Sequence, residues 1–178
     1  LNGRGTRVVW TTQTLYQPHA DSSNTYFSKD LDVLTAGVTS NRMVSSVTTV
    51  SVSAPRQSLA QIAAGNDGFL VVYRSQTAND SRIMSIKLDA NGNPVGAEPI
   101  QLDGGYPGLT NPAVVWNGSS YLAVWENSEE PAGGVTAQQG TIYGKRLGPD
   151  GSMLDATPFR ISRGKNASIA TLNTEFLI

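Results

Sequence analysis

The chain has 178 residues and a formal net charge of −1, with 15% charged and 39% hydrophobic residues. It contains no cysteine, which excludes disulfides, thiolate metal sites and cysteine nucleophiles. The balanced charge gives no electrostatic reason to bind nucleic acid, and no apolar run reaches the roughly 20 residues of a membrane-spanning helix. We therefore expect neither a nucleic-acid partner nor membrane insertion.

The N-terminal part is predicted to hold three strands and a long loop. Residues 6–12 read TRVVWTT, an aliphatic run that includes Trp10. Residues 13–24 are polar and interrupted by proline, so we expect an exposed loop there. The runs TYFSKDLD (25–32) and VTTVSVS (47–53) are the next strand candidates, the second because β-branched residues alternate along it.

Residues 58–108 contain four strand candidates in short succession. They read IAAG, FLVVYRS, IMSIKL and EPIQL, and turn-forming residues separate them. Between the last two lies DANGNP, in which Asn91-Gly92 favours the positive φ angles of a tight turn. This part of the chain is therefore predicted to form a four-stranded antiparallel unit.

The same pattern recurs along the chain. The run NPAVVWNGSSYLAVW is followed, after a polar stretch, by GTIYGKRLGPDGSMLDATPFRIS (140–162), and the run NASIATLNTEFLI (166–178) begins a further copy. In the first copy we match Leu31 with Leu88. The positions that define the repeat are Trp10, Tyr73 and Trp125, then Leu88 and Leu147, then Gly92 and Gly151.

A repeat of about 50 residues made only of strand-like pieces predicts an all-β fold. We expect a propeller-type array of four-stranded antiparallel blades in about three copies. The predicted divisions are a divergent, incomplete blade at 1–57, two clear blades at 58–108 and 109–165, and the start of another blade or a closing strand at 166–178.

The third copy carries a motif of the form I-x-G-x-x-L-x-x-x-G followed by P-F-x-I-S, formed by Ile142, Gly144, Leu147, Gly151, Pro158, Phe159 and Ser162. This motif resembles the repeats of bacterial secreted and cell-surface β-propeller proteins. The resemblance implies blades packed face to face around a central axis and an extracellular location.

The two ends of the array are incomplete in complementary ways. The first copy lacks its innermost strand, and residues 166–178 supply the beginning of one. Three interpretations follow: the chain is a piece of a longer repeat protein, its C-terminal strand closes its own ring, or separate chains complete one another. In each case further blades of the same or another chain are expected partners.

The sequence predicts no catalytic residue, cofactor or metal site. The histidine of the chain, His19, is interpreted as a solvated loop residue, and the run Asp89-Ala-Asn91-Gly92 as a turn rather than a calcium loop, because it lacks the distal bidentate glutamate. Trp116, on the predicted innermost strand, is a weak candidate for stacking on a sugar or aromatic ligand; the alternative is that it fills space between blades. Glycosylation sequons occur at Asn79, Asn117 and Asn166.

We expect a non-catalytic binding or scaffolding module of a secreted or cell-surface assembly, with a protein or glycan partner. Two alternatives stay open. One is a part of a propeller-fold glycan-active enzyme whose catalytic residues lie outside this chain, and the other is a lectin-like carbohydrate-binding module. A pocket that gathers carboxylates near the channel would favour the enzyme, and repeated aromatic pockets between blades would favour the lectin.

Overall fold

The computed structural model describes residues 6–13, 31–51, 56–128 and 140–178. The described part is all-β, built of antiparallel sheets of three to four strands with no helix, which confirms the predicted fold class at this level. Within these residues no helix has the length and hydrophobicity that crossing a bilayer requires. His19 and the polar stretch at 129–139 lie outside the described residues.

Three sheets and a short hairpin follow one another along the chain, and in each of them neighbouring strands in sequence are neighbours in space. The first sheet contains β1 (Thr6–Gln13), β2 (Leu31–Val38) and β3 (Thr48–Ser51). The second contains β4 (Arg56–Ala64), β5 (Gly68–Gln76), β6 (Ser81–Asp89) and β7 (Ile100–Tyr106). The third contains β8 (Leu109–Trp116), β9 (Tyr121–Asn127), β10 (Thr141–Leu147) and β11 (Phe159–Arg163). The terminal hairpin is β12 (Ala170–Leu172) with β13 (Glu175–Leu177).

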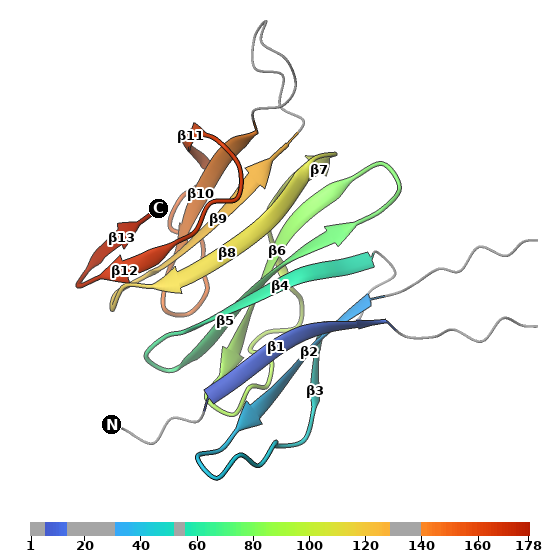
Figure 1. Ribbon diagram of the computed structural model, residues 1–178, viewed down its shortest axis with the longest axis vertical. Coiled ribbons are helices and arrows are strands. Elements are labelled where there is room, and N and C mark those ends of the chain that lie inside the picture. Colours follow the sequence, from blue (N-terminus) through green and yellow to red (C-terminus); the bar gives the residue numbers. More distant parts are fainter. Residues whose placement is uncertain (1–5, 14–30, 52–55, 129–139) are drawn as a thin grey trace, which may run out of the picture.

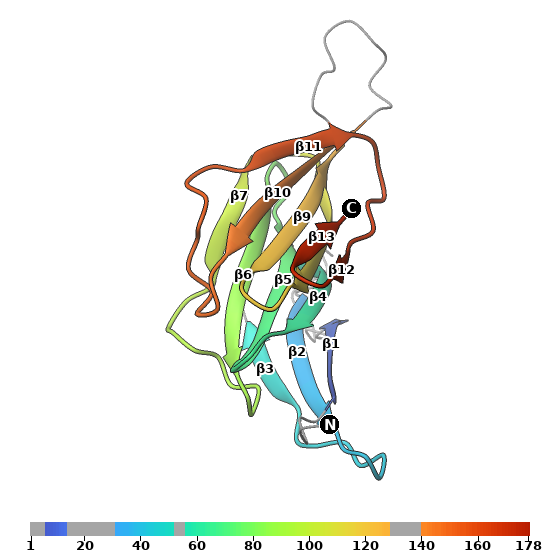
Figure 2. The same ribbon diagram turned by 90° about the vertical axis from the view of Figure 1, so that its left-hand side faces the viewer.

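The sheets are stacked face to face along the long axis of the molecule (Figure 1). Strands β1, β4 and β8 lie toward the viewer in Figure 1, and in Figure 2 β1 and β4 lie along one side of the molecule whereas β3 and β7 lie along the other. Strand β4 contacts both β8 and β1, and β12 contacts β8. The first strands of successive sheets therefore line one side of the stack.

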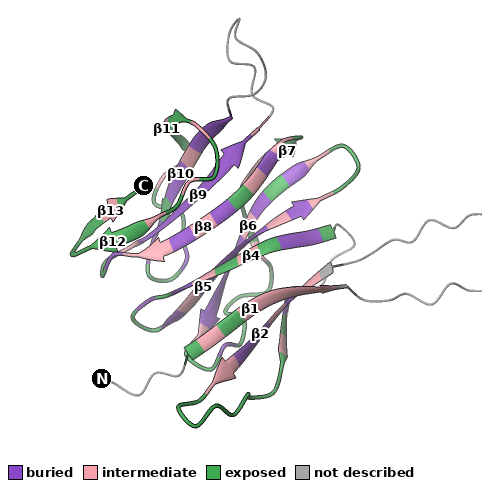
Figure 3. Ribbon diagram, viewed as in Figure 1, coloured by how far each residue is buried: buried purple, intermediate pink, exposed green. Residues whose placement is uncertain are grey.

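Hydrophobic side chains fill the space between consecutive sheets, because one strand of a twisted sheet presents alternate residues to its two faces. Strand β9 is buried along its whole length, and β5 is nearly so (Figure 3). Tyr73 packs between the first and second sheets and Trp125 between the second and third. Burying roughly 200 Å² of an aromatic side chain contributes about 5 kcal/mol before entropy is subtracted. The hydrophobic core thus lies at the interfaces between sheets.

The strand registers place the repeat aromatics at corresponding positions. Trp10 lies opposite Leu34, Tyr73 opposite Met84, and Trp125 opposite Tyr143. In each sheet a β-bulge interrupts the pairing of the next two strands directly beside that position. The second and third sheets occupy residues 56–106 and 109–163, the parts to which the repeat pattern assigns the two clearest copies.

The match of Leu31 with Leu88 is wrong. Leu31 begins β2, opposite Gln13, whereas Val38 ends it and forms an isolated bridge to Val44 six residues later. Leu88 forms the corresponding bridge to Pro94, as Leu147 does to Met153, so Val38 is the true counterpart of Leu88. A shared Leu-Asp dipeptide misleads here because the spacing to the following turn, not residue identity, decides which position is bridged.

The turn after this bridge position is the same in all three sheets. Arg42, Gly92 and Gly151 occupy its fourth residue with φ angles of 66°, 85° and 85°. Their amides donate to the carbonyl groups of Thr39, Asp89 and Gly148 at 3.0 Å in each case. Glycine adopts this left-handed conformation at little cost, whereas arginine does so only under the constraint of the surrounding turn. The first copy therefore keeps the turn geometry while losing the glycine that identifies it in sequence.

Candidate functional site

A hydrogen bond between side chains joins the second sheet to the first, and a corresponding one joins the third sheet to the second. Tyr73 Oη donates a hydrogen bond to Ser51 Oγ (3.0 Å), from the second sheet to the first. Trp125 Nε1 donates to Asp103 Oδ2 (2.9 Å), from the third sheet to the second. Ser51 and Asp103 are corresponding residues, since they lie opposite Val33 and Ile83 next to the bulge. The links fix how one sheet sits on the next, because each satisfies a polar group at an otherwise apolar interface.

A second kind of link lies nearer the first strands. Arg74 Nε donates to Ser58 Oγ (3.2 Å), and its Nη1 reaches Thr110 Oγ1 on β8 (3.5 Å). The corresponding residue of the third sheet is Glu126, whose Oε2 accepts from Asn111 Nδ2 (3.2 Å) and from the backbone N–H of Asn166 (3.1 Å). Burial lowers the pKa of the Arg74 guanidinium. In the second and third sheets, one side chain thus reaches the beginning of the next unit.

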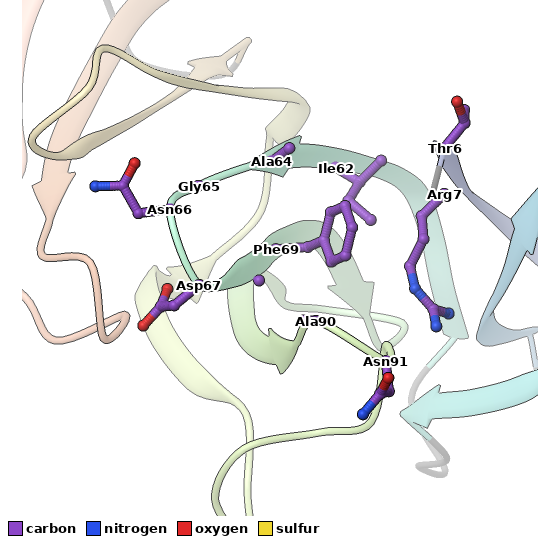
Figure 4. Close-up of a pocket in the computed structure, with 11 residues that line it drawn as sticks. Thr6, Arg7, Ile62, Ala64, Gly65, Asn66, Asp67, Phe69, Ala90 and Asn91 are labelled. Carbon is purple, nitrogen blue, oxygen red and sulfur yellow. The ribbon is translucent and has the colours of Figure 1, made fainter. Parts of the chain in front are cut away.

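The larger of two cavities, about 810 Å³, opens between β1 and the hairpin that joins β4 to β5 (Figure 4). Arg7 lies on one side, with its guanidinium carbon 5.8 Å from the centroid of the Phe69 ring, which faces it. Ile62 and Ala64 of β4 form the wall between them, and Asn91 closes the cavity from the turn after β6. The cavity combines an apolar wall, an aromatic ring and a cation.

Arg7 brings a buried polar atom without a hydrogen bond to this cavity. Its Nη1 atom is buried and has no hydrogen-bond partner among the described residues. The guanidinium lies against the backbone of Gly92, where a Cβ atom would overlap it. Asp67, the acid that lines the same cavity, is instead paired with the buried Lys87, with 3.0 Å between Nζ and Oδ1. Because β1 pairs only with β2 in the described part of the chain, its edge toward this cavity carries unpaired backbone groups.

The smaller cavity, about 450 Å³, lies on the side of the stack formed by the first strands. Three of its lining residues share an unusual backbone conformation: Leu59, Asn111 and Asn166 have φ angles of 57°, 49° and 56°. The pairing of β4 with β5 and of β8 with β9 shifts register at the first two, as expected for β-bulges. The bulge is therefore a repeated feature that bends β4 and β8 at the same place.

The acidic side chains serve turns and ion pairs. Asp89 Oδ1 accepts from the backbone N–H of Asn93 (2.8 Å), which lowers the pKa of its carboxyl group, and Asp150 accepts from Ser152 with the same effect on its pKa. Asp155 pairs with Arg146. No group of three or more His, Cys, Asp or Glu residues in the described ranges could hold a metal ion.

Two lysines are buried between sheets. Lys145 Nζ donates to the carbonyl oxygen of Leu102 (3.2 Å) and contacts Met153 Sδ (3.3 Å). Burial lowers the pKa of Lys145, an effect that the charges of Asp103 and Asp155 oppose. Because these lysines bond to backbone and neighbouring side chains of the stack, they tie sheets together rather than face a ligand.

Trp116 packs against Tyr121, with ring centroids 4.6 Å apart and planes inclined by 54°, at the edge of the core between the second and third sheets. It is half-buried and lines neither of the two cavities described above. Of the sequon residues, Asn117 is buried, donates to the carbonyl oxygen of Thr174 (2.7 Å) and accepts from Ser120, whereas Asn79 and Asn166 are exposed. A glycan at Asn117 would therefore require this bonded amide to leave its place.

Sequence reasoning missed Ser51 and Asp103 as partners of the aromatics. A signal was present for the second pair, because the 59-residue offset that aligns Leu88 with Leu147 also places Asp103 on Ser162 of the P-F-x-I-S motif. No comparable signal marks Arg7, whose place in the cavity depends on the packing of β1 against β4.

In comparisons with known proteins, no family model, no curated protein and no solved structure matches this chain.

Proposed function

We propose that the chain is a propeller-type array of four-stranded blades that acts as a non-catalytic binding or scaffolding module of a secreted or cell-surface assembly. The observation that carries this proposal is the repeated link between sheets, Tyr73 to Ser51 and Trp125 to Asp103, at the same register in successive interfaces. Sheets stacked with one repeated geometry and with their first strands on one side are what a propeller requires.

Two further features support a binding or scaffolding role. Among the described residues, Asp89 and Asp150 serve turns, Asp155 an ion pair and Asp103 a link between sheets. The geometry that repeats along the chain is a packing arrangement between sheets. The extracellular part of the proposal rests on the motif around Ile142, Leu147 and Phe159, which resembles repeats of bacterial secreted propeller proteins.

The stacking itself is tested by two double-mutant cycles. Tyr73→Phe with Ser51→Ala, and Trp125→Phe with Asp103→Asn, are compared in urea unfolding experiments. We expect coupling energies of the same sign, about 0.5–3 kcal/mol, because the members of each pair contact one another across an interface. Coupling in one pair and none in the other would contradict a common blade geometry.

The role is tested against the two alternatives by titrating the protein with oligosaccharides while its tryptophan fluorescence is recorded, and by incubating it with polysaccharides. A scaffold gives no saturable quenching and no chain cleavage. Saturable quenching that Trp116→Ala abolishes in a folded protein would replace the proposal with a lectin-like module. Cleavage of a polysaccharide would replace it with an enzyme.

A further inference from the structure

A buried lysine and an exposed methionine of the third sheet are in contact. Lys145, on β10, is 3% exposed, whereas Met153, in the connection between β10 and β11, is 47% exposed. Their side chains meet with 3.3 Å between Nζ and Sδ. Nζ also donates to the carbonyl oxygen of Leu102 on β7 (3.2 Å), so the lysine joins the third sheet to the second. The side chain that bonds across this interface therefore also contacts a residue that solvent reaches.

The ammonium group of Lys145 has strong donors and few strong acceptors around it. The carbonyl oxygen of Leu102 is a good acceptor, whereas the thioether sulfur of Met153 is a weak one. No ion pair joins Lys145 to a carboxylate in the part of the chain that the structure describes. Burying a charge costs free energy unless hydrogen bonds replace those that it made with water. A stronger acceptor in the place of the sulfur would therefore stabilise the interface.

The second sheet has no such pair at the corresponding positions. The isolated bridges that align the two sheets make Met153 the counterpart of Pro94 and Lys145 the counterpart of Ile86. Neither Ile86 nor Pro94 has a side chain that forms hydrogen bonds. A lysine and a methionine thus replace two apolar residues together, at positions whose side chains meet.

We propose that Met153 is a site of reversible oxidation, and that its sulfoxide oxygen accepts a hydrogen bond from the Lys145 ammonium and strengthens the link between the second and third sheets. The exposure of Met153 gives an oxidant access to it. A methionine side chain turns about several single bonds, so the new oxygen can be directed toward Nζ. The inference does not depend on the proposed binding role, because both residues and the interface belong to one chain.

The oxidant is hydrogen peroxide. A lone pair of the sulfur attacks one peroxide oxygen, a sulfur–oxygen bond forms and the oxygen–oxygen bond breaks. The second oxygen leaves with both hydrogens as water, so the thioether is oxidised by two electrons and the peroxide is reduced by two. The product is a polar group in place of an apolar one, and methionine sulfoxide reductases reverse the step.

The three methionines of the chain have different surroundings, which provides internal controls. Met43 is 63% exposed, in the connection between β2 and β3, and its oxidation should leave stability unchanged. Met84 packs against the core between the first and second sheets, where a polar sulfoxide should destabilise the protein. Met153 contacts a buried ammonium, and its oxidation alone is expected to raise stability.

The test uses two double variants that each keep one exposed methionine. Met43→Leu with Met84→Leu keeps Met153, and Met84→Leu with Met153→Leu keeps Met43. Each protein is oxidised with hydrogen peroxide, peptide mass mapping verifies the single sulfoxide, and urea unfolding compares it with its unoxidised form. We expect the folding equilibrium constant to rise about tenfold in the Met153 protein, as for a hydrogen bond from a charged donor, and to stay unchanged in the Met43 protein. Sulfoxide reductases should restore the original value.

Lys145→Ile, made in the protein that keeps Met153, identifies the donor. Isoleucine stands at the corresponding position of the second sheet as the buried Ile86, so the strand should accommodate it. Oxidation should now lower stability, because the sulfoxide lies beside an apolar side chain. The same gain in Lys145→Ile, no gain with Lys145 present, or a Met153 that peroxide leaves unchanged in the folded protein overturns the inference. If Lys145→Ile does not fold, the Met153 and Met43 proteins decide the question alone.

Discussion

At the scale of single residues, the aromatic of each interface combines bulk with a polar tip. Trp125 is fully buried and donates to Asp103, whose Oδ2 also accepts from Tyr106 Oη (2.8 Å). Trp125→Phe keeps the ring and removes the donor, so we expect the unfolding free energy to fall by about 1–3 kcal/mol. Trp125→Ala should cost about 3–5 kcal/mol because a cavity replaces the indole. Urea unfolding measures both, and an unchanged Trp125→Ala protein would contradict the packing.

Tyr121 places a hydroxyl group in the same interface without a hydrogen-bond partner among the described residues. Burial raises the pKa of this group from 10.0 to about 12. The unfolded chain therefore loses the proton first, so that stability falls as pH rises from 10.0 to about 12 and is unaffected by this group at lower pH.

The Tyr121→Phe variant tests this assignment. It removes an unpaired polar group, so stability at neutral pH should be unchanged or higher, and the decline above pH 10.0 should be shallower than in the wild type. Denaturant unfolding as a function of pH provides the measurement. Burial raises the pKa of Tyr73 as well, so part of the alkaline decline remains in the variant. An identical decline in both proteins would contradict the buried position of Tyr121.

At the scale of elements, the repeated turn is sensitive to what surrounds it. Gly92 and Gly151 share a φ of 85°, but a Cβ at Gly92 would overlap the Arg7 guanidinium, whereas one at Gly151 would meet Lys87 Cβ at 3.2 Å. Both alanine variants carry backbone strain of about 1–2 kcal/mol. Gly92→Ala should lose more stability than Gly151→Ala, because the Arg7 guanidinium must also move aside. Adding Arg7→Ala to Gly92→Ala should remove this extra loss. Equal losses in thermal unfolding would show that Arg7 does not pack there.

The terminal hairpin is held by Glu126, which accepts from the N–H of Asn166. Glu126→Ala should speed amide hydrogen exchange in β12 and β13 while leaving the second sheet protected, since the loss is local to the hairpin. Arg74→Ala is the matched control: it removes the corresponding link, to Thr110, and should not change exchange in the hairpin. Exchange that rises equally in both variants would contradict this division of roles.

The sequence predicts these elements well where the repeat is intact and poorly where it diverges. Tyr73 and Trp125 stand at corresponding registers because a buried aromatic at a strand centre leaves a clear pattern. The role of Val38 is not predicted, because it depends on the turn that follows. That turn is not recognised in the sequence, because Arg42 occupies the position where glycine is expected. The cavity at Arg7 depends on the spacing between sheets, which no local pattern records.

At the scale of the whole molecule, the stack behaves as a chain of neighbours, each stabilised by the next. Within the described residues, the second sheet packs against a neighbouring sheet on both faces, and the first packs against one on a single face. Tyr73→Ala should therefore release the first sheet and spare the third: hydrogen exchange of β1 and β2 rises, and that of β9 and β10 stays slow. Loss of protection throughout would show instead that the stack unfolds as one unit.

The order of the strands has a consequence for how the chain acquires its structure. Each sheet is a meander in which every strand pairs with its neighbour in sequence, so the contacts within a sheet are local in sequence, which favours rapid folding. Contacts between sheets need a whole further repeat to be present. The first sheet, made before the second, consequently gains the apolar cover that β4 and β5 provide only when these strands have been made. We expect the second sheet to serve as the folding nucleus on which both neighbours assemble.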